Sequence, residues 1–224
     1  MITIPDSDDF SFRINPYTRW VHEHPERLLS DPRPELLENR RRCHPSDRVL
    51  VELGSGSGNF LLQLAAYYPD YHAVGFELRY KRLVKSARKL EKQNLQNVWV
   101  LRETAENFTH YFAPSSVDRV FINFPDPWPK TSQWKKRMVN TLMLDRVERT
   151  LKPGGTFHLK TDHSGYFLHC LSLIRHCPGM RLLTMSNDLN RQRLPGPRLE
   201  SEFEQLFISK RKSVFYLVLE KNTA

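Results

Sequence analysis

The sequence predicts an α/β fold in which a mainly parallel sheet of seven strands, one of them antiparallel, has helices on both faces. The prediction rests on an alternation that begins at Arg48, where short β-branched and aromatic runs take turns with helical segments. Only the last two runs lack a helix between them, which predicts a hairpin-like pair and an antiparallel strand at or near the sheet edge. The expected strands are Arg48–Leu53, His72–Glu77, Asn97–Leu101, Arg119–Asn123, Thr156–Lys160, Arg181–Met185 and Ser213–Leu219.

Helical segments separate the other strands. They are expected at Gly58–Tyr68, Tyr80–Gln93, Ala105–Phe112, Ser132–Leu151 and Ser164–Cys177. The run Pro153-Gly154-Gly155 and the run Leu194-Pro195-Gly196-Pro197 indicate turns in the last third of the chain. Because no internal repeat or linker is visible, one domain is expected over residues 46–224.

The first 45 residues differ from this domain. They contain six prolines, many charges and four aromatic residues, but no sustained apolar period. We expect residues 1–45 to form an N-terminal arm that is partly irregular and ends in a short helix near residues 34–42.

The composition indicates a folded, basic protein. The chain has 224 residues, of which 39% are hydrophobic and 11% aromatic, more than a disordered basic tail carries. Its 34 Lys and Arg exceed its 25 Asp and Glu, and the net charge is +9. A charge of this size favours a polyanionic partner, because neutralised phosphates release their counterions.

The apolar runs and the chain start predict a cytoplasmic protein without a membrane anchor. The run Val214–Leu219 is far shorter than the ~20 apolar residues that span a bilayer. Acidic residues at positions 6, 8 and 9 stand where a signal peptide would carry Lys or Arg.

The cysteines predict neither a disulfide framework nor a metal site. Cys43, Cys170 and Cys177 are an odd number without a CxxC pair, so reduced thiols are expected. A His-Cys pair occurs at 169–170 and again at 176–177, a spacing of two helical turns. We interpret this repeat as helix packing, and no metal is expected.

A glycine-rich turn follows the first expected strand. Gly54, Gly56 and Gly58 let the backbone turn tightly and approach a ligand, and the helix that starts there directs N–H groups into a crevice. The spacing is GxGxG, and Asn59 stands where the dinucleotide pattern GxGxxG has its third glycine. Close approach of a pyrophosphate is therefore less well provided for. The alternative is a plain tight turn between strand and helix.

Cofactor contacts are also expected after the second and third strands. Glu77 lies at the tip of the strand beside the glycine turn, where a carboxylate can accept both hydroxyls of a ribose. Thr104 and Ala105 open the helix after the third strand, at the usual place for contact with adenine. The alternatives are a solvated acid for Glu77 and a plain helix N-cap for Thr104.

A proline-rich loop, residues 123–130, follows the fourth strand and carries the most information. Its three prolines fix the backbone and hold Asp126 and Trp128 at the carboxyl edge of the sheet, where open α/β folds bind ligands. A rigid carboxylate beside an aromatic ring suits a nucleobase. The alternative is a proline-rich surface loop without a ligand.

Basic residues gather in three segments. They are Lys130, Lys135, Lys136 and Arg137 after the proline-rich loop, Arg79, Lys81, Arg82, Lys85, Arg88, Lys89 and Lys92 in the second helix, and Lys210, Arg211 and Lys212 near the C-terminus. The first segment is expected to meet phosphate. In the second helix Glu91 is the only acid, so contact with an RNA backbone and a solvated helix face are both open.

These motifs resemble the bacterial tRNA (guanine-N(7)-)-methyltransferase family, which consists of class I S-adenosylmethionine-dependent methyltransferases. The resemblance runs from about Arg48 to Glu220, and residues 125–130, 160–162 and 201–204 carry it together with Glu52, the glycine turn and Glu77. The proline–aspartate–proline–tryptophan segment is highly specific to this family. The glycine turn is common to class I methyltransferases.

The resemblance implies a Rossmann-like methyltransferase domain, S-adenosylmethionine as cofactor, and N(7) of guanosine 46 in the tRNA variable loop as the methylated atom. The positions that match the cofactor contacts are Glu52, Gly54, Gly56, Gly58, Glu77, Thr104, Ala105 and Asp126. Those that match the substrate contacts are Lys130, Asp162, Ser201, Glu202, Phe203 and Glu204. The family usually has Asp where Thr104 stands, which leaves the adenine contact open, and Thr where Ser201 stands, so the hydroxyl is kept.

The chemistry of guanine indicates how these residues act. Nitrogen 7 carries a lone pair and no proton, so it needs no general base and positioning dominates. Methylation leaves the ring positively charged, and Asp126 is the expected catalytic residue because its carboxylate can stabilise that charge. Asp162 and Glu204 are expected to accept from N1 and the 2-amino group, with Ser201 capping the segment that holds Glu204.

Other functions fit the residues less well. A methyltransferase for amino groups of adenine or cytosine would carry acid–proline–proline–aromatic, and the second adjacent proline is missing after Asp126. An oxidoreductase would need GxGxxG, and a non-catalytic RNA-binding module would not need both Glu52 and Glu77. The expected partner is tRNA, and both a monomer and a homodimer stay open.

Overall fold

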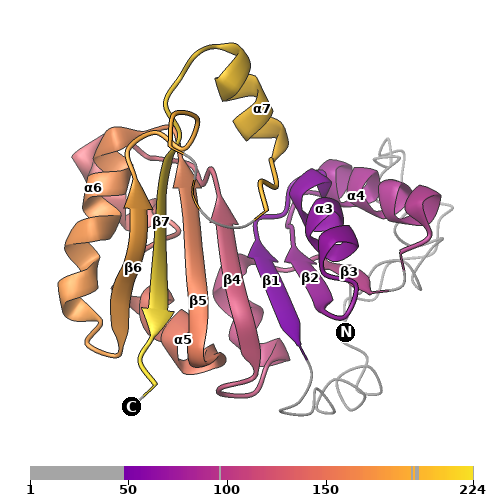
Figure 1. Cartoon of the computed structure of the whole chain (residues 1–224), viewed down its shortest axis with the longest axis horizontal. Coiled ribbons are helices and arrows are strands. Elements are labelled where there is room, and N and C mark those ends of the chain that lie inside the picture. Colours follow the sequence, from indigo (N-terminus) through magenta and orange to yellow (C-terminus); the bar gives the residue numbers. More distant parts are fainter. Residues whose placement is uncertain (1–47, 96, 193, 195–196, 224) are drawn as a thin grey trace, which may run out of the picture.

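A seven-stranded sheet forms the centre of the computed structural model, which describes residues 48–95, 97–192, 194 and 197–223 (Figure 1). Its strand order is β3-β2-β1-β4-β5-β7-β6. The strands are β1 (Val49–Leu53), β2 (His72–Phe76), β3 (Val98–Leu101), β4 (Val117–Asn123), β5 (Leu151–Thr161), β6 (Met180–Ser186) and β7 (Phe215–Lys221). All seven expected strands are therefore confirmed, while the expected arm 1–45 and its short helix lie outside the described residues.

The antiparallel strand lies one place in from the edge. Strands β1 to β5 pair in parallel, whereas β7 runs antiparallel to both β5 and β6. The centre of β7 is apolar and fully buried, at Leu217 to Leu219. The edge strand β6 leaves Leu182, Leu183 and Met185 partly exposed. The expectation of one antiparallel strand near the edge is confirmed.

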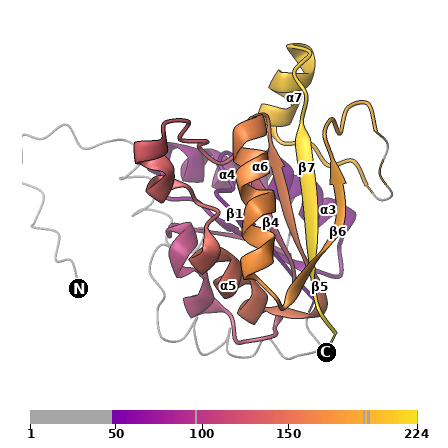
Figure 2. The ribbon, with the colours of Figure 1, turned by 90° about the vertical axis from the view of Figure 1, so that its left-hand side faces the viewer.

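Helices cover both faces of the sheet, as expected. They are α3 (Asn59–Tyr67), α4 (Tyr80–Gln93), α5 (Thr141–Thr150), α6 (Ser164–Leu173) and α7 (Glu202–Ser209), with 3-10 helices η2 (Ala105–Tyr111), η3 (Thr131–Lys136) and η4 (Ile174–His176). Buried residues of α3 and α4 pack on β2 and β3, and those of η2, α5 and α6 pack on the opposite face. Figure 2 shows α5 and α6 together on one side of the sheet.

The prediction of a single helix over Ser132–Leu151 is wrong. Residues 131–136 form η3, and α5 begins only at Thr141. Between them Arg137 has an extended backbone, and Asn140 caps α5 by accepting a hydrogen bond from the Met143 amide at 2.9 Å. An asparagine cap competes with helix continuation, because its side chain satisfies an N–H at a helix start.

The helix expected over Ser164–Cys177 also ends early. Helix α6 stops at Leu173 and the tighter turn η4 follows, so Cys170 and Cys177 do not lie on one continuous helix. Both are free thiols, and both are buried in the main core, which confirms the packing interpretation. In the described part of the chain no helix is long and apolar enough to span a membrane.

A helix also lies where the hairpin-like connection was expected. Helix α7 separates β6 from β7 and stands above the carboxyl ends of the central strands (Figure 1). Ser201 is its N-cap, and its Oγ accepts from the Glu204 amide at 3.1 Å, so the expected capping role is confirmed. Glu204 itself is 0% exposed and forms an ion pair with Lys160 on β5 at 2.6 Å. This buried pair attaches α7 to the sheet.

We expect Glu204→Ala to lower the free energy of unfolding by about 3 kcal/mol or more, because it leaves the buried ammonium of Lys160 without its carboxylate. Urea denaturation measures the change. The matched control is Glu202→Ala in the same helix, which breaks a solvent-exposed pair with Lys89 and is expected to cost less than about 1 kcal/mol. Equal losses in the two variants would contradict the anchoring role of Glu204.

Candidate functional site

A crevice opens at the carboxyl ends of β1, β2 and β4. The chain leaves β1 toward β2 on one side and returns to β4 on the other, and open α/β sheets bind ligands at such a switch point. The crevice holds a cavity of about 340 Å³. Residues 52–57, 76–79, 103–106, 123–126 and 201–203 line most of it. The loops after four strands and the start of α7 therefore meet in one place.

The glycine turn forms one wall of this crevice. Gly54, Gly56 and Gly58 all have left-handed backbones, with φ of 78°, 59° and 80°. Gly54 and Gly56 line the cavity, as expected. Gly58 does not, because it faces α4, where an added Cβ would stand 3.0 Å from Cβ of Ser86. Gly58 thus serves the close packing of the turn against α4.

Glu77 holds the glycine turn in shape. It is 7% exposed, and its Oε2 accepts from the Gly56 amide at 3.0 Å while Oε1 accepts from the Arg79 amide at 2.7 Å. The solvated-acid alternative is therefore wrong. Each carboxylate oxygen can accept a further hydrogen bond, so the expected ribose contact stays compatible with this geometry.

Glu52 is a buried carboxyl group at the floor of the crevice. It is 2% exposed, and its Oε1 accepts from Nδ2 of Asn123 at 2.9 Å, while Oε2 is buried without a hydrogen-bond partner among the described residues. Burial raises the pKa of Glu52 to about 8, although the Asn123 bond and the charge of Lys160 act in the opposite direction. A cationic or hydrogen-donating ligand group would satisfy this oxygen.

The side chain of Thr104 does not cap the helix after β3, so the plain N-cap alternative is wrong. Thr104 precedes η2, but its side chain makes no capping bond. Glu103 replaces it by accepting from the Thr104 amide at 2.7 Å and from Asn107 at 3.1 Å. Burial alone would raise the pKa of Glu103, yet these bonds and one from Tyr111 hold it below its ordinary value. Thr104 and Ala105 line the cavity, as does Glu103, which sequence reasoning left without a role.

The proline-rich loop forms the opposite rim. Phe124 and Trp128 both have left-handed backbones, with φ of 51° and 40°, which is strained for residues with large side chains. Asp126 lies between them, exposed to solvent, and lines the cavity. Lys130 lies outside the cavity and is also exposed. The loop therefore presents its carboxylate to the crevice and its lysine to the surroundings.

The other expected substrate residues lie at and above the crevice. Ser201, Glu202 and Phe203 line the cavity. Asp162, at the end of β5, is half-buried, lies outside the cavity lining and is 3.5 Å from Nζ of Lys212. Glu204 does not offer its carboxylate to a base as expected, because it is fully buried against Lys160.

Two residues of α4 join the glycine turn to α7, and sequence reasoning missed this role. Nζ of Lys89 donates to the Ser57 carbonyl at 3.0 Å and to Asn59, and it pairs with Glu202 at 3.3 Å. The guanidinium of Arg82 lies 5.6 Å from the ring centre of Phe203. The periodicity of the charges marks this helix as basic, but only the fold shows that these two side chains point toward the crevice mouth.

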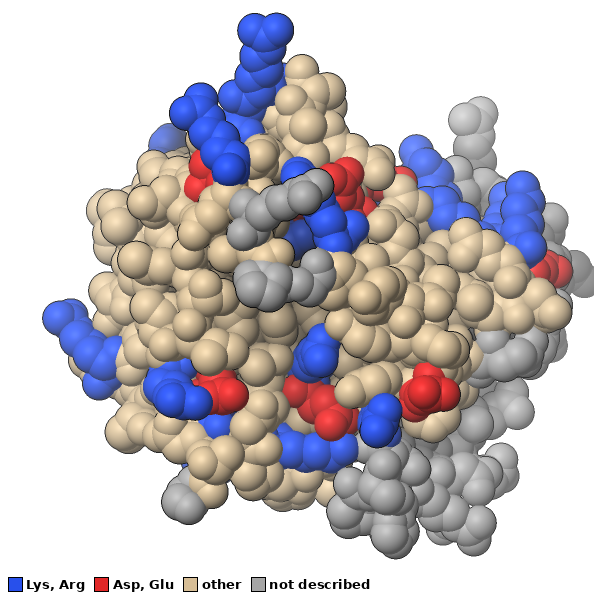
Figure 3. Space-filling view, viewed as in Figure 1, with Lys and Arg blue, Asp and Glu red and all other residues tan. Residues whose placement is uncertain are grey.

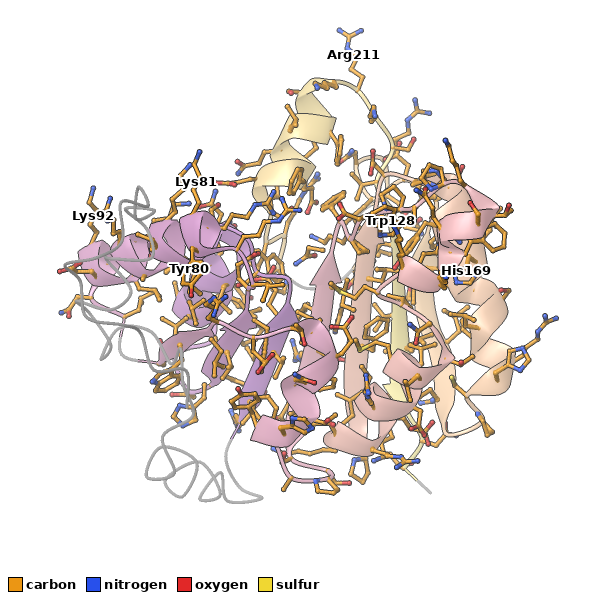
Figure 4. All side chains as sticks on the ribbon, turned by 180° about the vertical axis from the view of Figure 1, so that it is seen from behind. Tyr80, Lys81, Lys92, Trp128, His169 and Arg211 are labelled. Atoms are coloured by element: carbon orange, nitrogen blue, oxygen red, sulfur yellow. The ribbon has the colours of Figure 1, made fainter. Side chains whose placement is uncertain are left out.

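Other basic side chains surround the crevice without entering it. On α4, Lys81, Lys85 and Lys92 are exposed, and residues 210–212 beyond α7 are exposed as well. Figure 3 shows Lys and Arg gathered at the top of the molecule and over α4, and in Figure 4 Lys81, Lys92 and Arg211 extend outward. The rim is therefore positively charged on two sides, while six acidic residues line the crevice together with Arg79 and Arg82.

The fold and the crevice define a class I methyltransferase. A solved structure titled "Structure of an Antibiotic Related Methyltransferase" has a TM-score of 0.63 and 21% identity, and the match covers 85% of this chain and 95% of that one. A family model described as "Putative methyltransferase" matches residues 46–217.

Curated relatives narrow the class. The tRNA (guanine-N(7)-)-methyltransferase of Lactobacillus gasseri is 33% identical over 201 residues, which are 88% of this chain and 92% of that protein. A bifunctional glycosyltransferase/methyltransferase of Fusobacterium nucleatum subsp. nucleatum is 36% identical over 79% of this chain, which spans only 27% of that relative. The chain belongs to the tRNA (guanine-N(7)-)-methyltransferase family.

The crevice fits the cofactor of this class, S-adenosylmethionine. Gly54 and Gly56 line the cavity without side chains of their own, so a ligand can approach the backbone there. The unpartnered Oε2 of Glu52 suits the amino group of a methionine moiety, and the carboxylate of Glu77 suits ribose hydroxyls. The acceptor groups of this wall therefore suit the donor groups of the cofactor.

The raised pKa of Glu52 predicts a pH dependence of stability. The carboxyl ionises near pH 4.5 in the unfolded chain but near pH 8 in the folded one, so the unfolded state binds fewer protons between these values. The free energy of unfolding should therefore fall with rising pH, by up to about 1.4 kcal/mol per unit from this group. Urea denaturation of the wild type and Glu52→Gln at pH 5 to 8 isolates the effect. A parallel pH dependence in the two proteins would contradict it.

Proposed function

We propose that this protein transfers the methyl group of S-adenosylmethionine to N(7) of a guanosine in the variable loop of tRNA, in the cytoplasm. One observation carries the proposal beyond family membership. The rigid proline-rich loop presents the carboxylate of Asp126 at the rim of the cavity whose other wall is the glycine turn with Glu77. A methyl donor bound at the glycine turn would thus lie next to a negative charge on the other wall.

The division of labour follows from the chemistry. When bound, S-adenosylmethionine supplies an electrophilic methyl group on a positively charged sulfur. Glu52 and Glu77 hold the donor, and Asp126 stabilises the positive charge that develops on the guanine ring as N7 attacks. Since N7 carries no proton, none of these carboxylates has to act as a base.

The residues at the start of α7 support a binding place for the guanine base. Ser201, Glu202 and Phe203 reach the cavity, and Phe203 offers an aromatic ring against which a base can stack. Lys130 and Asp162 lie farther out, where they suit the rest of the nucleotide. Glu204 acts indirectly, because its buried pair with Lys160 holds α7 in place.

Incubation of the protein with labelled S-adenosylmethionine and unmodified bulk tRNA tests the proposal. Nucleoside analysis should find the label in 7-methylguanosine, and mapping of the methylated site should place it in the variable loop. Label in methyladenosine or methylcytidine would indicate an amino-group methyltransferase instead. No label in RNA would contradict an enzyme of this kind altogether.

Asp126→Asn should lower turnover on the order of tenfold to a thousandfold and leave the fold and most of the cofactor affinity intact, because it removes charge without changing shape. Single-turnover methylation assays and calorimetric titration with S-adenosylmethionine measure the two effects. Asp145→Asn on α5 is the control, since that residue pairs with Arg149 away from the crevice. Wild-type turnover in a folded Asp126→Asn protein would show that another carboxylate stabilises the charge.

The basic rim predicts a strong salt dependence of tRNA binding, because each phosphate contact releases counterions. Replacement of Lys81, Lys85 and Lys92 by Gln should reduce the slope of log affinity against log salt by roughly 2 to 3. Filter binding across a salt series measures the slope. Arg149→Gln on α5 is the control and should leave the slope unchanged. An unchanged slope in the triple variant would show that these lysines form a solvated helix face and do not contact RNA.

A further inference from the structure

Arg137 is buried, unlike the two lysines that precede it. The sequence groups it with Lys135 and Lys136 as a phosphate contact, and these two lysines are indeed exposed. Arg137 is 2% exposed and its guanidinium points into the protein, so the phosphate assignment is wrong for this residue. A buried cation at the edge of the site needs another explanation.

The guanidinium of Arg137 donates hydrogen bonds to the backbone of the proline-rich loop. Its Nε donates to the Pro127 carbonyl at 3.0 Å, and Nη2 donates to the Trp128 carbonyl at 3.4 Å. These carbonyls belong to the two peptide planes on either side of the Trp128 Cα. A rigid, planar group that holds both planes therefore fixes φ and ψ of Trp128, which is one of the two strained left-handed residues of the loop.

Two aromatic rings complete the surroundings of Arg137. The guanidinium carbon is 4.4 Å from the ring centre of Trp134 and 5.2 Å from that of Tyr166. Tyr166 is fully buried on α6, and its hydroxyl accepts from the Val139 amide at 3.0 Å. The ring centre of Trp134 also lies 5.7 Å from that of His169 on α6. Arg137 thus connects the proline-rich loop to the helix that follows Asp162.

The balance of interactions indicates a role beyond stability. Among the salt bridges of the described residues none involves Arg137, and its Nη1 is buried without a hydrogen-bond partner there. Burying a charge without an opposite charge is costly, and a well-packed apolar residue often serves stability as well or better. An apolar residue at position 137 could not donate the two hydrogen bonds to the carbonyls of the loop.

We infer that Arg137 is a positioning residue for methyl transfer: it holds Trp128 in the left-handed conformation and thereby sets the direction of the Asp126 carboxylate. The inference rests on the proposed function for its kinetic consequences. Because Asp126 stands two residues before Trp128 and is joined to it through Pro127, a change in the Trp128 backbone turns Asp126 with it.

Arg137→Lys tests the inference, since lysine keeps the charge but cannot hold two carbonyls in one plane. We expect kcat on tRNA to fall roughly 10- to 100-fold, as for a misplaced catalytic group. The KM for tRNA and the affinity for S-adenosylmethionine should change less than about threefold. Lys135→Gln is the matched control of the opposite kind, because this exposed neighbour should affect the KM for tRNA and the salt slope. An Arg137→Lys protein with wild-type kcat and a raised KM would overturn the inference in favour of a phosphate contact.

A second variant covers a failure of Arg137→Lys to fold. Arg137→Ala leaves space for added methylguanidinium, which should restore part of the lost turnover in that variant and have no effect on the wild type. Absence of rescue would count against the positioning role, because a folded variant that binds S-adenosylmethionine should accept the replacement group.

A structural readout separates this inference from the proposed function. If the wild type forms no 7-methylguanosine, the proposed function fails, and the crystal structure of Arg137→Lys then decides the inference alone. Trp128 is expected to leave the left-handed region in that structure. A Trp128 that keeps φ near 40° without the guanidinium would overturn the role of Arg137.

Discussion

The buried ammonium group of Lys160 makes the interactions on which both α7 and the floor of the crevice depend. It pairs with Glu204 and donates to the Leu199 carbonyl at 2.8 Å, so it holds both the start and the approach of α7. It also lies 5.4 Å from the ring centre of Phe60 on α3, and its charge opposes the rise in the pKa of Glu52. One side chain on β5 therefore interacts with α7, with the helix after the glycine turn and with the acid at the crevice floor.

Acidic side chains and exposed basic side chains occupy different parts of the site. Glu52, Glu77 and Asp126 line the crevice, where the proposed function places a donor with a positive sulfur and a ring that becomes positive. Exposed lysines and arginines stand on α4 and beyond α7, where the proposed function places an RNA backbone. Lys89 and Arg82 lie at the boundary and connect α4 with α7 above the mouth. The proposed function thus assigns the acidic groups to the cofactor and the reacting base, and the basic groups to the RNA backbone.

Features that depend on local pattern could be predicted from the sequence. The seven strands, the left-handed glycines and the cap at Ser201 follow from periodicity, glycine spacing and an S-x-x-E pattern. The break after η3 could have been predicted from Asn140, a strong capping residue inside an otherwise helical pattern. The helix that follows this cap, α7, was not expected, because its eight residues are too few to show a helical period. The burial of charged side chains could not be predicted from the sequence. Lys160, Glu204 and Arg137 resemble surface residues there, and only tertiary packing shows that each is buried against a specific partner.

Thermal melting of the full chain with added ligands tests most directly whether the crevice is a methyl-donor site. A ligand that binds only the folded state raises Tm in proportion to the logarithm of its concentration above its dissociation constant. S-adenosylmethionine is expected to raise Tm in this way, and NAD at the same concentration is expected to leave it unchanged, because the GxGxG turn lacks the third glycine of a dinucleotide site. A shift with NAD, or none with S-adenosylmethionine, would contradict the account.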